Sequence, residues 1–273
     1  MPFPLLLNSA YVWGHILAAS IFLANDLPIP LNKSLDKITE GNLNEVVDVK
    51  NNKEFLDLSN DINSTVDTLK GYIDAASKRI DEELEFARNI QTSSLPTKFP
   101  VRQDFEIFAS MNTAKEVGGD FYDFYMTKRN TINFLIADVS GKGIPAAMFM
   151  MRAKTELKSL TETGCSLSEV FTKGNNALCE GNDAGMFVTA WQASVDLDTG
   201  DMTYVNAGHN PPLIKHKDGS FEFIKSKVGF VLAGMEEVQY KEEQIKLLEG
   251  YTIYLYTDGV TEATNKDKKL FTE

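Results

Sequence analysis

The chain has 273 residues, of which 43% are hydrophobic and 24% are charged, and its formal net charge is −12. These proportions are ordinary for a globular protein and allow a packed core. The acidic excess argues against a nucleic-acid ligand, because phosphate backbones are bound by clustered Lys and Arg. Cys165, Cys179 and three scattered histidines form neither a zinc-ligand pattern nor a disulfide framework.

The first segment with a recognisable pattern is an uncharged run from Leu5 to Ala24. Its length is just sufficient to cross the hydrocarbon core of a bilayer. A buried helix or the core of a signal peptide would have the same composition. Lys33 and Lys37 follow the run and no basic residue precedes it, which favours a cytoplasmic position for the rest of the chain. We therefore expect a transmembrane helix at residues 5–24 and a protein located at the cell membrane.

Two helical patterns come next. Leu31, Leu35 and Ile38 are spaced by four and three residues and are followed by Gly41, which predicts a short amphipathic helix. In the second, longer pattern, apolar residues alternate at spacings of four and three, as in the seam of a coiled coil. These residues are Ile62, Val66, Leu69, Ile73, Ala76 and Ile80. After a slip of one residue at Leu84, the seam continues to the neighbourhood of Pro96.

The order of short helix, connector and a second helix beginning at Glu54 resembles a HAMP domain. HAMP domains are four-helix dimers that relay signals beneath membrane receptors. The resemblance covers residues 28–74 and implies a homodimer, with residues 75–96 as a coiled-coil linker helix. A generic coiled coil is the alternative interpretation of this pattern.

From Phe105 onward the sequence changes to short segments rich in β-branched and aromatic residues, which predict strands. These segments are 105–109, 131–137, 186–196 and 202–205. Turns at Asp198–Asp201 and Lys217–Gly219 have the composition of hairpins, and hairpins join antiparallel strands. Helical patterns at Ala146–Leu160 and Leu167–Cys179 separate the strands. The sequence therefore predicts an α+β domain that is built on antiparallel sheet.

Three aspartates, Asp120, Asp138 and Asp258, each lie beside glycine at a predicted strand end. A carboxylate near a core is costly without a partner, and hard divalent cations are the usual partners. Asp beside Gly is also common in turns, so a turn role is the better interpretation of any single one. Three in similar contexts favour a metal site. Asp123 is excluded, because in an extended segment its side chain would face away from that of Asp120. His209, alone in a turn, is interpreted as structural.

Six segments in order resemble the SpoIIE/RsbU-type branch of the PPM (PP2C-like) protein phosphatases. They are Glu83–Pro96, Val117–Asp123, Ala137–Gly143, Met186–Ala190, Asn206–Pro212 and Tyr256–Ala263. The resemblance implies that residues 105–273 form a sandwich of two antiparallel β-sheets flanked by helices. It also implies two Mn²⁺ or Mg²⁺ ions, with Asp120 and Asp138 as core ligands, the Val139 carbonyl assisting and Asp258 as a further ligand.

The same resemblance implies the reaction, in which a metal-activated water hydrolyses phosphoserine or phosphothreonine on a regulatory protein. The expected substrate is a phosphorylated STAS-type anti-anti-sigma factor. Members of the family continue past the Thr-Asp-Gly motif and supply another aspartate from an Asp-Asp-x-Thr segment. This sequence stops at Glu273 without one. The resemblance therefore implies a truncated domain, and we expect weak or absent phosphatase activity with Mn²⁺.

Two alternatives belong to other functional classes. One is a catalytically impaired signalling or binding module that dimerises through its HAMP-like coiled coil. The other is a dinucleotide-binding protein, because Gly141–Ala146 fits GxGxxA between a strand and a helix. The second alternative is disfavoured, since no acidic residue closes a second strand about 20 positions further on and the hairpins contradict a parallel sheet.

Overall fold

The computed structural model describes residues 29–50, 53–113, 115–127 and 130–271. The chain divides into two compact units, which meet at Glu82 and Glu83 and are described separately below. The segment Leu5–Ala24, for which a transmembrane helix is predicted, lies outside the described residues. Among the residues that are described, no helix combines the length and the apolar character needed to cross a membrane.

The first unit contains helix α2 (Ile29–Thr39) and the first part of helix α3 (Lys53–Ser94). Leu31, Val47 and Val49 are buried in a small core between the helices and their connector. Asn63 on α3 holds the connector, because its side chain accepts a hydrogen bond from Val47 N at 2.9 Å and donates one to Val47 O at 2.8 Å. The predicted helix–connector–helix order is present, and the assignment as a HAMP domain remains a prediction.

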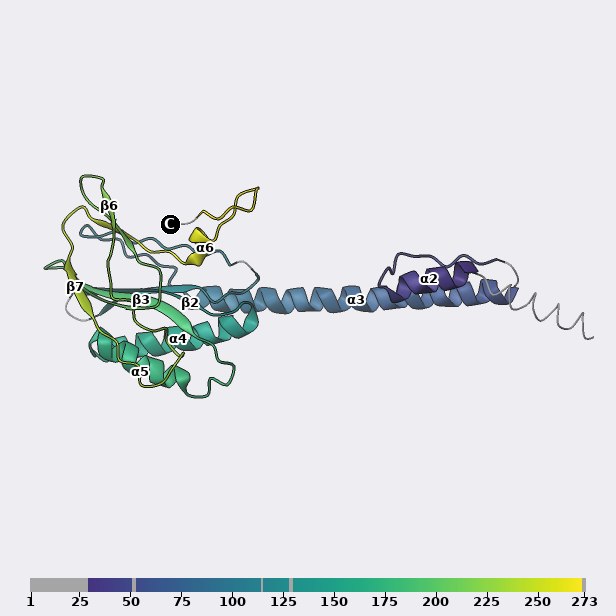
Figure 1. Ribbon diagram of the computed structural model, residues 1–273, viewed down its shortest axis with the longest axis horizontal. Coiled ribbons are helices and arrows are strands. Elements are labelled where there is room, and N and C mark those ends of the chain that lie inside the picture. Colours follow the sequence, from purple (N-terminus) through teal and green to yellow (C-terminus); the bar gives the residue numbers. More distant parts are fainter. Residues whose placement is uncertain (1–28, 51–52, 114, 128–129, 272–273) are drawn as a thin grey trace, which may run out of the picture. The chain divides into compact units, whose positions relative to one another are not determined.

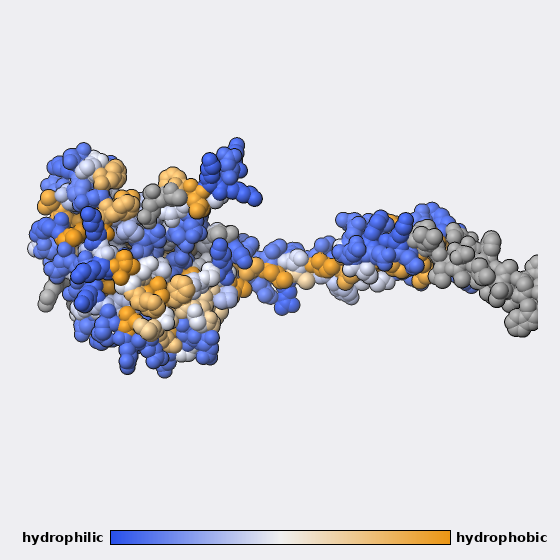
Figure 2. Space-filling view, in the orientation of Figure 1, coloured by the Kyte–Doolittle hydropathy of each residue, from blue (hydrophilic) through white to orange (hydrophobic). Residues whose placement is uncertain are grey.

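Helix α3 is 42 residues long and ends two residues before Pro96, where proline cannot continue a helix. Of its predicted seam, Val66 is buried, whereas Leu69, Ile73 and Ile80 are between 45% and 56% exposed. Figure 2 shows apolar side chains spaced along this helix. From Leu69 onward, the seam is therefore open to solvent in the single chain.

The second unit is a sandwich of two antiparallel sheets (Figure 1). The larger sheet has the strand order β1 (Phe121–Thr127), β2 (Thr131–Val139), β3 (Val188–Asp196), β4 (Asp201–Ala207) and β7 (Glu243–Lys246). The smaller sheet has the order β6 (Phe221–Phe223), β5 (Leu213–Lys215) and β8 (Thr252–Tyr254). Both predicted hairpins are confirmed, since β3 pairs with β4 and β5 pairs with β6. The α+β class with antiparallel sheets is confirmed as well.

Helices α4 (Ile144–Glu162) and α5 (Leu167–Cys179) cover one face of the larger sheet, as Figure 1 shows. The alternating faces of β2 separate two cores, because successive side chains of a strand point in opposite directions. Leu135, Ala137 and Val139 pack in the core with the helices. Ile132, Phe134 and Ile136 pack in a second core that includes Trp191, Tyr204 and Ile214 and lies between the two sheets.

The sequence-based expectations were wrong for one strand and missed three others. Phe105–Ala109, predicted as a strand, has no regular structure, although Phe105 and Ile107 pack against the core between the sheets. The alternating apolar side chains of this segment are packed, although its backbone pairs with no strand among the described residues. No bounds were predicted for strands β1, β7 and β8. β1 forms a hairpin with the next strand, β2, whereas β7 and β8 pair with β4 and β5, which lie well before them in the chain.

Candidate metal centre

The pairing of β1 with β2 brings Asp120 and Asp138 together. Phe121 lies opposite Ala137, so the same antiparallel register continued by one residue places Asp120 opposite Asp138. Opposite residues share one face of a sheet. Asp138 shares its face with Ile136, which packs toward the second sheet. The two half-buried carboxyl groups are thus neighbours at the edge of the space between the sheets.

Gly119 allows the backbone of this site to pack closely. A Cβ atom at position 119 would lie 2.5 Å from the carbonyl oxygen of Val139, which is closer than real Cβ atoms approach a backbone oxygen. The Val139 carbonyl therefore lies against the residue that precedes Asp120. Only glycine at position 119 permits this approach without displacing one of the two strands.

The last turns of α3 hold the segment that leads to Asp120. The buried side chain of Gln91 donates a hydrogen bond to Gly118 O at 2.6 Å and accepts one from Gly118 N at 3.2 Å. Arg88 Nε donates to Glu116 O at 2.7 Å. These contacts fix the backbone two residues before the first predicted ligand.

Asp258 is the first residue of the short helix α6 (Asp258–Thr261) and is exposed. The preceding Thr257 donates a hydrogen bond from Oγ1 to Oδ2 of Asp120 at 2.9 Å, which brings α6 beside the pair. Within the described ranges, however, no three Asp, Glu, His or Cys side chains are arranged as a ligand group for a metal ion. Asp258 is therefore next to the pair, but the three carboxyl groups do not form a complete ligand set.

The electrostatics of the site show how crowded its carboxyl groups are. Burial raises the pKa of Asp138 to about 8, with contributions from the charge of Asp120, from a hydrogen bond with it, and from the charges of Asp258 and Glu262. Burial also raises the pKa of Asp120, and the charge of Asp258 acts in the same direction. Like charges in a desolvated site disfavour ionisation, and a divalent cation would relieve that cost. Carboxylate and carbonyl oxygens are ligands that Mg²⁺ and Mn²⁺ prefer, so the donor chemistry fits.

Asp123 is not part of the site, as expected from the alternation of the strand. Its side chain faces the helices, where Lys154 Nζ on α4 donates to Asp123 Oδ2 at 2.7 Å. Lys158 Nζ lies 3.9 Å from the same oxygen. Both Asp123 and Lys154 are buried, so this ion pair ties β1 to α4.

Two threonines near the site were not predicted as site residues, although both lie in segments that carry the family resemblance. Thr257 contacts Asp120 across 137 positions of the chain. Thr189 lies opposite Asp138 in the β2–β3 register, and its Oγ1 is 2.8 Å from Nδ1 of the buried His209. The Nε2 atom of His209 lies 3.2 Å from Tyr256 O. Thr189 belongs to the Met186–Ala190 segment, but its position opposite Asp138 follows only from the pairing of β2 with β3.

Comparison with known proteins identifies the domain. The family model for stage II sporulation protein E (SpoIIE) matches residues 128–273, which is more than half of the chain. The chain belongs to the SpoIIE family. Phosphoserine phosphatase RsbU from Bacillus subtilis (strain 168) is 38% identical over 201 residues, which make up 73% of this chain and 58% of RsbU. The chain spans about half the length of the curated relatives that it matches.

Solved structures agree with the fold. The SiaA-PP2C domain of Pseudomonas aeruginosa matches with a TM-score of 0.58 at 20% identity, covering 73% of this chain and 80% of that domain. The RsbU and RsbW domains of Rv1364c from Mycobacterium tuberculosis match with a TM-score of 0.50 at 26% identity, covering 57% of this chain and 42% of that one. The SpoIIE-family domain thus has the PP2C fold that the sequence resemblance implied.

Proposed function

We propose that this SpoIIE-family chain is a metal-dependent protein serine/threonine phosphatase of a bacterial-type signalling pathway. The observation that carries the proposal is the apposition of Asp120 and Asp138 across the β1–β2 register, at the edge of the space between the sheets. The similarity to RsbU, which is named a phosphoserine phosphatase, supports phosphoserine or phosphothreonine as the substrate group.

In this proposal Asp120 and Asp138 hold the cations, with the Val139 carbonyl and Asp258 as further ligands. Two bound Mn²⁺ or Mg²⁺ ions would supply an activated water and neutralise the charge of the phosphoryl group. The protein itself contributes by positioning the oxygen atoms that would bind these ions. Thr257 orients the Asp120 carboxyl group through its hydrogen bond to Oδ2, and the absence of a side chain at Gly119 lets the Val139 carbonyl lie beside it.

The proposed partner is a phosphorylated regulatory protein, with a STAS-type anti-anti-sigma factor as the first candidate. In Rv1364c from Mycobacterium tuberculosis an RsbU domain occurs together with an RsbW domain, which supports a regulatory protein pathway of this kind. We also propose that the chain is located at the cell membrane through residues 5–24, with the phosphatase domain in the cytoplasm.

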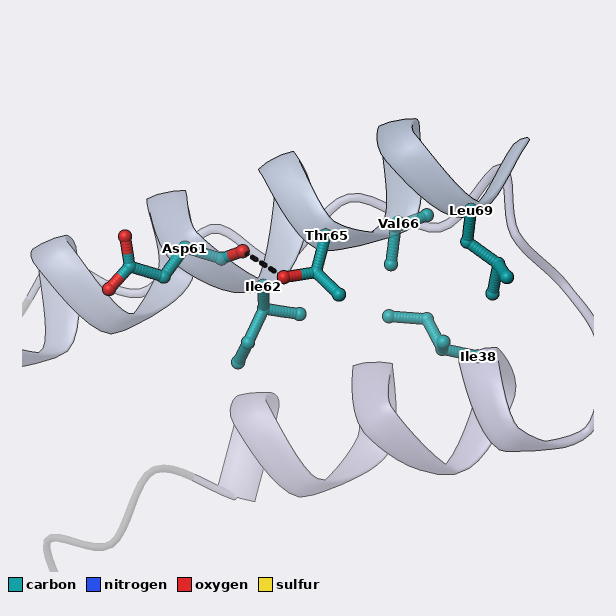
Figure 3. Close-up of a pocket in the computed structure, with 6 residues that line it drawn as sticks. All are labelled: Ile38, Asp61, Ile62, Thr65, Val66 and Leu69. Atoms are coloured by element: carbon teal, nitrogen blue, oxygen red, sulfur yellow. Dashed lines mark hydrogen bonds between the residues drawn. The ribbon is translucent and has the colours of Figure 1, made fainter. Parts of the chain in front are cut away.

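We further propose that the chain is a homodimer through its HAMP-like and coiled-coil segments. Figure 3 shows Ile38 on α2 facing Val66 and Leu69 on α3 across an apolar groove. The groove has a volume of about 300 Å³. The groove and the exposed Ile73 and Ile80 leave apolar side chains open along α3, which the facing helices of a second copy would cover.

Titration with Mn²⁺ by calorimetry, followed by assay of phosphate release from a phosphoserine protein, tests the proposed function. We expect Asp138→Asn to weaken Mn²⁺ binding by roughly 100-fold or more, because it removes a charged ligand. Asp183→Asn makes the same chemical change at an exposed position and should bind Mn²⁺ like the unsubstituted chain. Equal binding by the Asp138→Asn variant would contradict the role of the pair. A folded chain that binds no Mn²⁺ would favour the non-catalytic signalling module.

A further inference from the structure

We propose that His209 is a positioning residue of the metal centre, a buried link that holds the segment carrying Thr257 and Asp258 against the strands that carry Asp138. The proposal rests on the proposed metal-dependent function. It assigns to His209 a role beyond the structural turn residue that the sequence suggested.

The imidazole ring connects two parts of the site directly. On one side, Nδ1 lies 2.8 Å from Oγ1 of Thr189, the residue opposite Asp138 in the β2–β3 register. On the other side, Nε2 lies 3.2 Å from the carbonyl oxygen of Tyr256, the residue before Thr257. One side chain therefore spans from the partner strand of Asp138 to the entrance of α6.

The partners of the ring determine where its proton lies. The Tyr256 carbonyl can only accept a hydrogen bond, so Nε2 carries the proton and donates it. Nδ1 then accepts from the Thr189 hydroxyl. The same hydroxyl is 3.5 Å from Asp138 O, and its single hydrogen is directed to the nearer Nδ1. Both nitrogens of a neutral imidazole thus have hydrogen-bond partners. Burial lowers the pKa of His209 to about 4, which also favours the neutral form.

Hydrogen bonds fix the backbone around His209 and thereby restrict where its ring can lie. His209 N donates to Asn206 Oδ1 at 2.8 Å, and Asn206 Nδ2 donates to His209 O at 3.1 Å. Gly208 has φ +76°, and a Cβ atom there would lie 2.7 Å from a methyl group of Val231. Asn206 belongs to β4, so these contacts anchor the histidine to the larger sheet.

At the other end of the link, the buried ring of Tyr256 stacks on Tyr254 with ring centroids 5.9 Å apart, whereas the helix that follows has less support. Helix α6 is four residues long and none of its residues is buried. Its entrance is held by the His209–Tyr256 hydrogen bond on one side and by the Thr257–Asp120 hydrogen bond on the other. Loss of the imidazole would therefore let Asp258 move relative to Asp120 and Asp138. Among the described hydrogen bonds, none joins His209 directly to these three carboxyl groups, so it acts by positioning.

The test is Mn²⁺ affinity, measured by calorimetry on variants of the 273-residue chain that circular dichroism shows to be folded. We expect His209→Ala to weaken Mn²⁺ binding by about 10-fold or more, as is typical when a residue that supports metal ligands is removed. His209→Gln, whose amide N–H can reach Tyr256 O, should recover most of the affinity. Thr189→Val, which removes only the hydroxyl, should lose part of it, whereas Thr189→Ser should retain it.

Leu178→Ala is the control for a purely structural effect, because Leu178 is fully buried in α5. It should lower the thermal midpoint and leave the Mn²⁺ affinity of the folded protein unchanged. Equal Mn²⁺ affinity in His209→Ala and the unsubstituted chain, or an equal loss in Leu178→Ala, would overturn this inference alone. Absence of Mn²⁺ binding by the unsubstituted chain would overturn the proposed function and the inference with it. If His209→Ala does not fold, Thr189→Val decides.

Discussion

Asp120 and Asp138 come from segments 18 positions apart, and antiparallel pairing of β1 with β2 sets them opposite each other. Their neighbours make this approach possible. Gly119 leaves room for the Val139 carbonyl, and Thr257 contributes a hydrogen bond to Asp120. The raised pKa of both carboxyl groups is the electrostatic consequence of burying like charges together.

Gly119→Ala tests the close approach at this site. The added Cβ would lie 2.5 Å from Val139 O, so one strand must shift. We expect a loss of about 1–3 kcal/mol in the free energy of unfolding, measured in urea, together with weaker Mn²⁺ binding. Gly71→Ala is the control, since a Cβ there meets nothing within 4 Å and alanine favours the α3 helix. A Gly119→Ala variant as stable as its parent would contradict this explanation.

The buried His209 predicts a pH dependence of stability. Its folded pKa of about 4 is below the unfolded value of about 6.5, so the unfolded chain binds a proton more readily between these values. Its contribution is complete above pH 6.5 and decreases as the pH falls toward 4. We expect a loss on the order of 3 kcal/mol from pH 7 to pH 4, measured as the difference between the unsubstituted chain and His209→Gln in urea. Parallel pH profiles of the two proteins would contradict the prediction.

Among the secondary-structure elements, those whose signals are local could be predicted from the sequence. Helix α5 has the predicted bounds because Ser166 and Glu169 form a capping box at its start. The β3–β4 and β5–β6 hairpins follow from turns that contain Gly200 and Gly219, both with positive φ. The composition of these turns is a local signal.

Elements that depend on distant partners could not be predicted in the same way. Strand β8 has three residues and pairs with β5, about 40 positions earlier in the chain. The three aspartates of the candidate site could be predicted from their motifs. The register of β1 with β2 explains why Asp120 and Asp138 lie opposite each other. The position of Asp258 depends on Thr257 and on the Tyr256–His209 contact, which are tertiary contacts without a local signal.

The ion pair between β1 and α4 gives a prediction for the packing of these elements. Lys154→Met leaves the buried Asp123 carboxylate with only Lys158, at 3.9 Å, as a nearby cation. We expect a loss of about 3–5 kcal/mol in the free energy of unfolding, because an uncompensated charge is buried. The Asp123→Leu/Lys154→Met double variant, measured by the same urea titration, should be more stable than Lys154→Met. A double variant as unstable as the single one would argue against this explanation.

On the scale of the whole molecule, α3 belongs to both units, with its first part in the helical unit and its end in the phosphatase-like domain. Leu69, Ile73 and Ile80 of its predicted seam are between 45% and 56% exposed in the single chain. A homodimer would bury this seam.

The proposed dimer predicts the effect of charge on the seam. Ile73→Lys places a charge on the seam, whereas Tyr72→Lys places the same charge one position away, where the side chain is 71% exposed. We expect Ile73→Lys to weaken dimerisation by roughly 10-fold or more and Tyr72→Lys to leave it unchanged, as measured by sedimentation equilibrium. A monomeric parent chain, or equal association of both variants, would contradict the proposed dimer.

The central claim is that carboxyl groups from distant parts of the chain hold divalent cations at the edge of the space between the two sheets. The most direct measurement is anomalous diffraction at the manganese edge from crystals grown with Mn²⁺. We expect peaks bonded to the carboxyl oxygens of Asp120 and Asp138, with Asp258 drawn toward them. Peaks confined to other surfaces, with the Asp120–Asp138 pair binding no manganese, would contradict the claim.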